Sequence, residues 1–144
     1  MRARMSPSNI MGAASGDLRV VVADDQAAFR EVACGVVGEA TGLRLVGCVD
    51  RVSAVPAVVA AERADALLLD VRMPGEDSLA MAAQLRRARP HLRILLVSAD
   101  SVEDIPDDVF DLGIGFLAKD ELEPDTLLAA LHLGQGCPRA TGSG

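Results

Sequence analysis

Aromatic residues and cysteines are scarce in this 144-residue chain, and each shortage excludes something. Phe, Trp and Tyr together make up 2% of the residues, with neither Trp nor Tyr present, so the core must be aliphatic. The three cysteines, Cys34, Cys48 and Cys137, are odd in number, widely spaced and without a CxxC pair. This pattern favours reduced thiols or small core residues over a disulfide framework or a zinc site.

Basic charge and long apolar runs are lacking as well. A net charge of −7 and a pI of about 4.7 argue against nucleic-acid binding by this chain alone. No apolar run approaches the ~20 residues of a membrane span, and the first residues have no apolar region of the kind found in secretory signals. His91 and His132 are far apart and have no metal-like partner in the sequence, so we expect both at the surface.

The hydrophobic half of the chain is enough for the core of one domain. We expect a flexible tail over residues 1–16, one domain over residues 17–133 and a second tail over residues 134–144. Short apolar stretches predict five strands, at residues 18–23, 43–49, 64–69, 94–97 and 114–118.

Five helices are expected to alternate with these strands. In the first, apolar residues recur at near-helical spacing: Phe29, Val32, Val36 and Val37. The other helix signals are Ser53 as an N-cap with Pro56 in the first turn, Ser78 as the cap of a helix that runs to Arg89, Pro106 at the start of a short or irregular helix that ends at Gly113, and Pro124 in the first turn of the last helix.

The strands are continuously apolar rather than alternating, which indicates that helices cover both faces of the sheet. The sequence therefore predicts an α/β fold, a doubly wound five-stranded parallel sheet with five helices, of the flavodoxin-like kind. Ligands of such sheets bind at the carboxyl ends of the strands.

Charged and polar residues stand at those carboxyl ends. Asp24 and Asp25 follow the first strand and Asp70 follows the third, while Ser98 and Lys119 follow the fourth and fifth. Three carboxylates at one rim repel one another unless a cation intervenes. Because Mg²⁺ takes one or two carboxylates and completes its shell with water and phosphate, the sequence predicts a Mg²⁺ site with a phosphate as fellow ligand.

Lys119 is the only lysine in the chain, against thirteen arginines. A genome that favours arginine so strongly is expected to use it at an ordinary surface position. A compact point charge in place of a planar fork therefore indicates a specific role for Lys119.

Four segments, VVADDQ, LLLDVRMPG, ILLVSAD and GFLAKD, resemble in order and spacing the receiver domain of two-component response regulators, over roughly residues 17–133. The detail is most similar to the receivers of LuxR/NarL-type regulators, which precede a helix-turn-helix DNA-binding domain. The resemblance implies the receiver fold, a signalling phospho-acceptor rather than an enzyme, and a cytoplasmic location. It also implies a sensor histidine kinase as partner, with a homodimer as a further option.

The resemblance assigns roles at the acidic end of the sheet. Asp70 would accept the phosphoryl group from a kinase phosphohistidine. Asp25 and Asp70 would bind Mg²⁺ together with the backbone carbonyl of Arg72, and Asp24 would act largely through water.

The remaining family roles fall on Ser98 and Lys119, which would bind phosphoryl oxygens, and on Phe116, which would join Ser98 in the switch. This chain departs from the family in three places. Phe116 lacks the hydroxyl of a switch tyrosine, Ser78 replaces a common glycine and is expected to cap a helix, and the acidic Pro106 segment falls in the helix used as the output face.

Other interpretations remain open or are set aside. A haloacid-dehalogenase-type phosphatase needs a second acid two residues after its nucleophile, where this chain has Arg72. The GxGxxA match at Gly113–Ala118 precedes or forms a strand, so it does not predict a dinucleotide site. The chain is expected to end before a helix-turn-helix, which leaves the receiver half of a LuxR-type transcription factor and a non-phosphorylated interaction module as alternatives.

Arg72 and Asp100 each lie two residues past a site residue and carry opposite charges. They are either two solvated loop charges or a pair across the mouth of the pocket that hinders water from attacking a phospho-aspartate.

Overall fold

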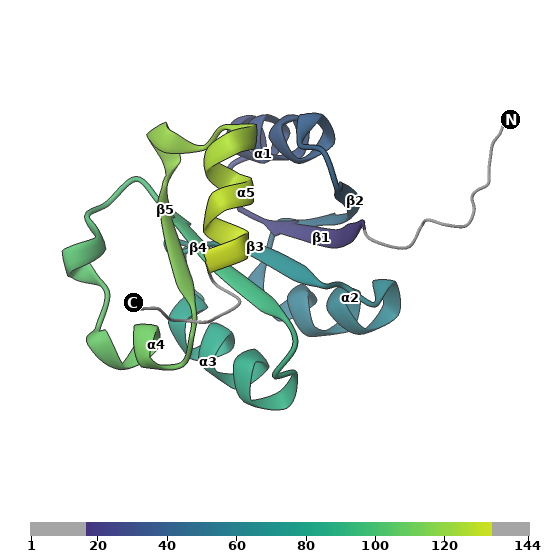
Figure 1. Ribbon diagram of the computed structural model, residues 1–144. Coiled ribbons are helices and arrows are strands. Elements are labelled where there is room, and N and C mark those ends of the chain that lie inside the picture. The colour runs from purple at the N-terminus through teal and green to yellow at the C-terminus, as the bar shows by residue number, and fades with distance from the viewer. Residues whose placement is uncertain (1–16, 134–144) are drawn as a thin grey trace, which may run out of the picture.

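The computed structural model describes residues 17–133, so the two expected tails and Cys137 lie outside the described residues. Five strands form one parallel sheet in the order β2-β1-β3-β4-β5 (Figure 1). The strands are β1 (Leu18–Ala23), β2 (Leu43–Val49), β3 (Ala66–Asp70), β4 (Arg93–Ser98) and β5 (Gly115–Ala118). The predicted fold class is confirmed. β1 and β2 have the predicted bounds, and the ends of β3, β4 and β5 differ from the predicted ones by at most two residues.

Five α-helices alternate with the strands, as predicted. They are α1 (Ala27–Glu39), α2 (Val55–Glu62), α3 (Ser78–Ala88), α4 (Asp107–Asp111) and α5 (Pro124–Leu133). Short 3-10 turns at Val52–Ala54, Val102–Asp104 and Lys119–Glu121 join some of them to the strands. The helix expected near Pro106 is indeed short, with Pro106 as its N-cap residue.

Helices cover both faces of the sheet, α1 and α5 on one and α2, α3 and α4 on the other (Figure 1). Successive residues of β1 face opposite ways, so Val20 and Val22 pack toward α1 and α5 while Val21 and Ala23 pack toward α2 and α3. Every residue of β3 is buried. This two-sided burial is the reason that the strands are continuously apolar.

The two serine caps expected from the sequence are wrong. Asp77, with extended backbone, is the N-cap residue of α3, and its carboxylate accepts a hydrogen bond from the Ala80 amide at 3.0 Å. Ser78 is already helical and buried, and its hydroxyl has no hydrogen-bond partner among residues 17–133. Ser53 lies inside a 3-10 turn, because the chain enters α2 through that turn rather than through an extended residue.

The apolar face of α1 also differs from the expected one. Val32 is 54% exposed, whereas Ala33 and Val37 are buried against the sheet. Phe29, Ala33 and Val37 are spaced four residues apart and so form one stripe, from which Val32 is displaced by about 100° around the helix. The two histidines of the domain, His91 and His132, are exposed as predicted.

Gly47 of β2 generates a prediction about the packing of α2 on the sheet. A Cβ atom at this position would lie 2.8 Å from Cγ1 of Val58, a stiff β-branched side chain. We expect Gly47→Ala to lower the free energy of unfolding by about 1–3 kcal/mol, because the overpacked region must shift.

Gly35, in the interior of α1, is the matched control for this prediction. A Cβ atom there meets nothing within 4 Å, so Gly35→Ala should raise the free energy of unfolding by about 0.5–1 kcal/mol through helix propensity. Urea denaturation of the full chain measures both changes. A Gly47→Ala protein as stable as the wild type would contradict the close approach of α2 to β2.

Candidate functional site

The site lies where the order of the strands reverses. The chain goes from β1 outward to β2 at one edge and then returns to β3 on the other side of β1, so β1 and β3 are adjacent at a topological switch point. Connections leave this point on opposite faces, and a crevice opens beyond the carboxyl ends of the two strands. Asp24 directly follows β1 and Asp70 is the last residue of β3, so both acids reach the crevice.

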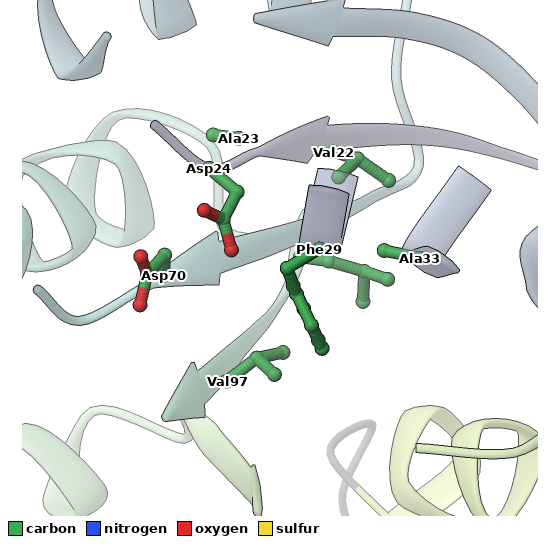
Figure 2. Close-up of a pocket in the computed structure, with 8 residues that line it drawn as sticks. Val22, Ala23, Asp24, Phe29, Ala33, Asp70 and Val97 are labelled. Carbon is green, nitrogen blue, oxygen red and sulfur yellow. The ribbon is translucent and has the colours of Figure 1, made fainter. Parts of the chain in front are cut away.

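Three carboxylates converge at this crevice, as the sequence predicted. One oxygen from each of Asp24, Asp25 and Asp70 lies within 4.8 Å of the other two. Asp24 and Asp70 are 1% and 3% exposed, whereas Asp25 is open to solvent. In Figure 2 the side chains of Asp24 and Asp70 project from adjacent strand ends, with Phe29 lining the same pocket.

Asp24 is held in place through its backbone and one of its carboxylate oxygens. Oδ1 accepts a hydrogen bond from the Gln26 amide at 2.8 Å, and the Arg30 guanidinium donates to the Asp24 carbonyl at 2.8 Å. The other oxygen, Oδ2, is buried and accepts no hydrogen bond of good geometry from the part of the chain that the structure describes, although Lys119 Nζ lies 3.1 Å away. The contact with Lys119 is therefore an ion pair, and Oδ2 keeps a lone pair that a further cation could use.

Asp70 has a strongly altered proton affinity. Burial is the main cause that raises the pKa of Asp70 from 3.8 to about 6, and the negative charges of Asp24 and Asp25 add to it. The Arg72 amide, which donates to Asp70 Oδ1 at 3.2 Å, and the Lys119 ammonium oppose this rise. A carboxylate of this kind gains free energy from any cation that enters the site.

Lys119 supplies the cation that the protein itself brings to the site. Its Nζ lies 3.1 Å from Asp24 Oδ2 and 3.6 Å from Asp70 Oδ2, and only 14% of its side chain is exposed. The ammonium also lies over the ring of Phe29, 4.3 Å from the centroid. This contact of Phe29 with Lys119 was not predicted from the sequence, although Phe29 lies in the first turn of the helix that follows the acidic pair.

Ser98 and the two loop charges complete the rim. Ser98 ends β4, is fully buried, and accepts a hydrogen bond on Oγ from the Asp100 amide at 2.9 Å. The Asp100 carboxylate in turn pairs with Arg72, at 2.5 Å between Nε and Oδ2, so the opposite charges do meet. Arg72 and Asp100 line one open pocket, together with Gln26, Asp70, Ala99 and Lys119.

Phe116 and the GxGxxA match do not line the pocket that contains Asp70. Phe116 lies in β5 opposite Leu96 of β4 and packs, half-buried, against the core on the α2, α3 and α4 side. The GxGxxA match contributes β5 itself and opens no helix after a strand, so it is not a dinucleotide loop. Among residues 17–133, no helix has the length and apolar character needed to cross a bilayer.

Comparison with known proteins agrees with this geometry. Residues 20–132 match the family model of the response regulator receiver domain. The probable transcriptional regulatory protein NarL of Mycobacterium tuberculosis is 34% identical over 120 residues, which cover 83% of this chain and 56% of that protein. An uncharacterised transcriptional regulatory protein of Bacillus subtilis, YxjL, is 28% identical over 80% of this chain and 53% of its own length. The chain thus spans about half the length of the curated relatives that it matches.

Solved structures show the same arrangement. The signal receiver domain of the putative response regulator NarL from Mycobacterium tuberculosis superposes with a TM-score of 0.71 at 32% identity, covering 82% of this chain and 98% of that one. The isolated receiver domain of RcsB from Salmonella enterica serovar Typhimurium, with a TM-score of 0.72 at 23% identity over 88% and 94% of the two chains, shares the fold. The family model matches most of the domain, and the sheet places its acidic residues at the topological switch point. This chain therefore belongs to the family of response regulator receiver domains.

Proposed function

We propose that this chain accepts a phosphoryl group on Asp70 from the phosphohistidine of a sensor histidine kinase, in a Mg²⁺-dependent reaction that switches an output surface. The observation that carries the proposal is a cluster of three carboxylates, two of which pair with the only lysine of the chain. Acyl phosphate formation needs a carboxylate nucleophile, a metal to neutralise developing charge and positioned donors. The pocket offers residues for each part.

The carboxylate set fits a magnesium ion. Asp25 and Asp70 would hold it together with the backbone carbonyl of Arg72, and Asp24 would act largely through water. Two observations support this fit, namely the buried oxygen Asp24 Oδ2, which accepts no hydrogen bond, and the raised pKa of Asp70. When bound, the ion supplies positive charge that stabilises the phosphoryl oxygens in the transition state.

The residues of the chain divide the remaining work. Asp70 Oδ1 is occupied by the Arg72 amide, so Oδ2, which faces Lys119, is the oxygen we assign to attack. The new bond joins this oxygen to phosphorus while the bond between phosphorus and the kinase histidine nitrogen breaks. Lys119 would then bind a phosphoryl oxygen as a point charge.

Ser98 and Phe116 would carry the signal onward. The Ser98 oxygen accepts from the Asp100 amide, which leaves its hydroxyl hydrogen free to donate to a phosphoryl oxygen. A movement of Ser98 toward the phosphate would loosen the packing next to β5, and the half-buried Phe116 would then change rotamer. The output that responds is, in our proposal, the regulation of transcription, since the curated relatives are named as transcriptional regulatory proteins.

Magnesium binding leads to a prediction with a worked sign. At a hundredfold excess over Kd, Mg²⁺ should raise the free energy of unfolding by roughly 2.7 kcal/mol. Because the pKa of Asp70 rises from 3.8 to about 6 on folding, protonation of Asp70 stabilises the metal-free fold below about pH 4, and this contribution is lost as pH rises through about 6. Mg²⁺ must displace that proton, so its thermal shift should be larger at pH 7.5 than at pH 5.

The test compares two variants that each lose one negative charge, one inside the acidic cluster and one outside it. Asp25→Ala should abolish the thermal shift, whereas Asp50→Ala, which removes an exposed acid paired with Arg51, should leave it intact. Equal thermal shifts by Mg²⁺ in the wild type and in Asp25→Ala would contradict the proposal that Asp25 binds the metal.

Phosphorylation of Asp70 is the direct test of the proposed function. Incubation with acetyl phosphate and Mg²⁺ should add one phosphate to the intact mass, labile to base and hydroxylamine as acyl phosphates are. Asp70→Asn should stay unmodified, and Lys119→Arg should respond poorly because a planar fork cannot replace the point charge. If the wild type gains no adduct from any donor, the chain is a receiver-like interaction module.

The ion pair between Arg72 and Asp100 leads to a kinetic prediction. Arg72 is 74% exposed, so the pair contributes only ~0–1 kcal/mol to stability, but it stands at the edge of the pocket that contains Asp70. As a gate, it should slow attack of water on the phospho-aspartate. The measurement is the dephosphorylation rate of wild type, Arg72→Ala, Asp100→Ala and the double variant. If the effects of the two single substitutions on ln k add up to the effect of the double substitution, Arg72 and Asp100 act independently and do not form a gate.

A further inference from the structure

Cys34 and Cys48, fourteen residues apart in sequence, lie side by side in the fold. Cys34 is in the second half of α1 and Cys48 is near the end of the edge strand β2, and their sulfur atoms are 2.6 Å apart. Both are free thiols in the structure, Cys34 half-buried and Cys48 exposed. The sequence pattern predicted reduced thiols or small core residues, and neither cysteine is fully buried.

We propose that Cys34 and Cys48 form a reversible disulfide, made when a hydroperoxide oxidises the pair, that fastens α1 to β2. A disulfide bond is about 2.05 Å long, so the sulfur atoms need only a sub-ångström approach. Both residues are already held by neighbouring structure, since Cys34 packs against the core next to the buried Ala33, and Cys48 pairs in register with Val22 of β1. The proposal uses none of the residues of the acidic pocket and does not depend on phosphorylation.

The exposure of the two thiols assigns their order of reaction. Cys48 is open to solvent because β2 is an edge strand, so its thiolate meets the oxidant first. Burial, reinforced by the adjacent Cys48, raises the pKa of Cys34 from 9.0 to about 12, with only partial relief from Arg30. Cys34 is therefore a poor first nucleophile and acts second, where proximity compensates for its low thiolate fraction.

The chemistry balances with one peroxide per pair. The Cys48 thiolate attacks a peroxide oxygen, so that an S–O bond forms, the O–O bond breaks and Cys48 becomes a sulfenic acid. The departing hydroxide takes up the proton that the Cys48 thiol lost and leaves as water. The Cys34 sulfur then attacks the Cys48 sulfur, the S–S bond forms, the S–O bond breaks, and a second water leaves with the Cys34 proton. Two thiols and one hydrogen peroxide thus give one disulfide and two waters, and a small dithiol reverses the step.

The crosslink should stabilise the fold. It closes a loop that contains the end of α1, the turn at Thr41 and Gly42 and most of β2, and so it restricts the unfolded chain. For a loop of this length in a domain of this size, we expect Tm to rise on the order of 10 °C.

The experiment uses the full chain with Cys137→Ser, so that only the proposed pair remains. After treatment with hydrogen peroxide, the intact mass should fall by two hydrogens, neither thiol should react with maleimide, and Tm should rise. Dithiothreitol should restore both thiols and the original Tm. The matched controls, Cys34→Ser with Cys137→Ser and Cys48→Ser with Cys137→Ser, should show neither the mass loss nor the Tm rise.

Three outcomes would overturn the proposal. The first is a chain that still reacts with maleimide at both thiols after oxidation. The second is a product that migrates as a disulfide-linked dimer, which would place the bond between chains. The third is a terminal sulfinic or sulfonic acid on Cys48 with Cys34 still free, which would show that the second thiol does not reach the first.

Discussion

The two buried carboxylates at the ends of β1 and β3 impose the constraint on which the rest of this structure depends. Asp24 and Asp70 are almost fully buried and carry like charges, and such a pair is costly unless a cation faces it. Lys119 provides that cation from beyond β5, two strands away from Asp70 across β4. The contact therefore requires β1, β3, β4 and β5 to end at one level, which the parallel register achieves by pairing Ser98 with Ala118 and Asp70 with Val97.

Aliphatic packing on both faces holds the strands at that level. With few aromatic side chains, the buried core consists of Met73 and of Val, Leu, Ile and Ala side chains, which divide between the α1 and α5 side and the α2, α3 and α4 side. Such a core is sensitive to small changes of volume, as the approach of Gly47 to Val58 illustrates. Close packing of this core fixes the strand ends, and with them the positions of Asp24, Asp70 and Lys119.

The same site works against the stability of the metal-free protein. A folded-state pKa of about 6 for Asp70 means that its ionised form is disfavoured by folding near neutral pH. Lys119 offsets part of this cost but leaves Asp24 Oδ2 without a directed hydrogen bond. An acidic pocket that is incompletely neutralised by its own lysine has residual affinity for cations, and we connect this feature with the proposed use of Mg²⁺.

Sequence alone determined the local elements and the chemistry of the rim. Continuous apolar runs predicted the five strands, the acids after them predicted the cluster, and the only lysine among arginines marked Lys119. These signals are short-range, because burial and strand ends are recorded in the residues themselves.

The tertiary structure alone decided which distant residues meet. The order of the strands, the ring of Phe29 under Lys119 and the contact of Cys34 with Cys48 all depend on how elements pack. The sequence separation of such pairs has no relation to their distance in space, since helix rotation and strand register are set by the summed packing of the core. That is why the pattern of residues predicted the acidic cluster but not the thiol pair.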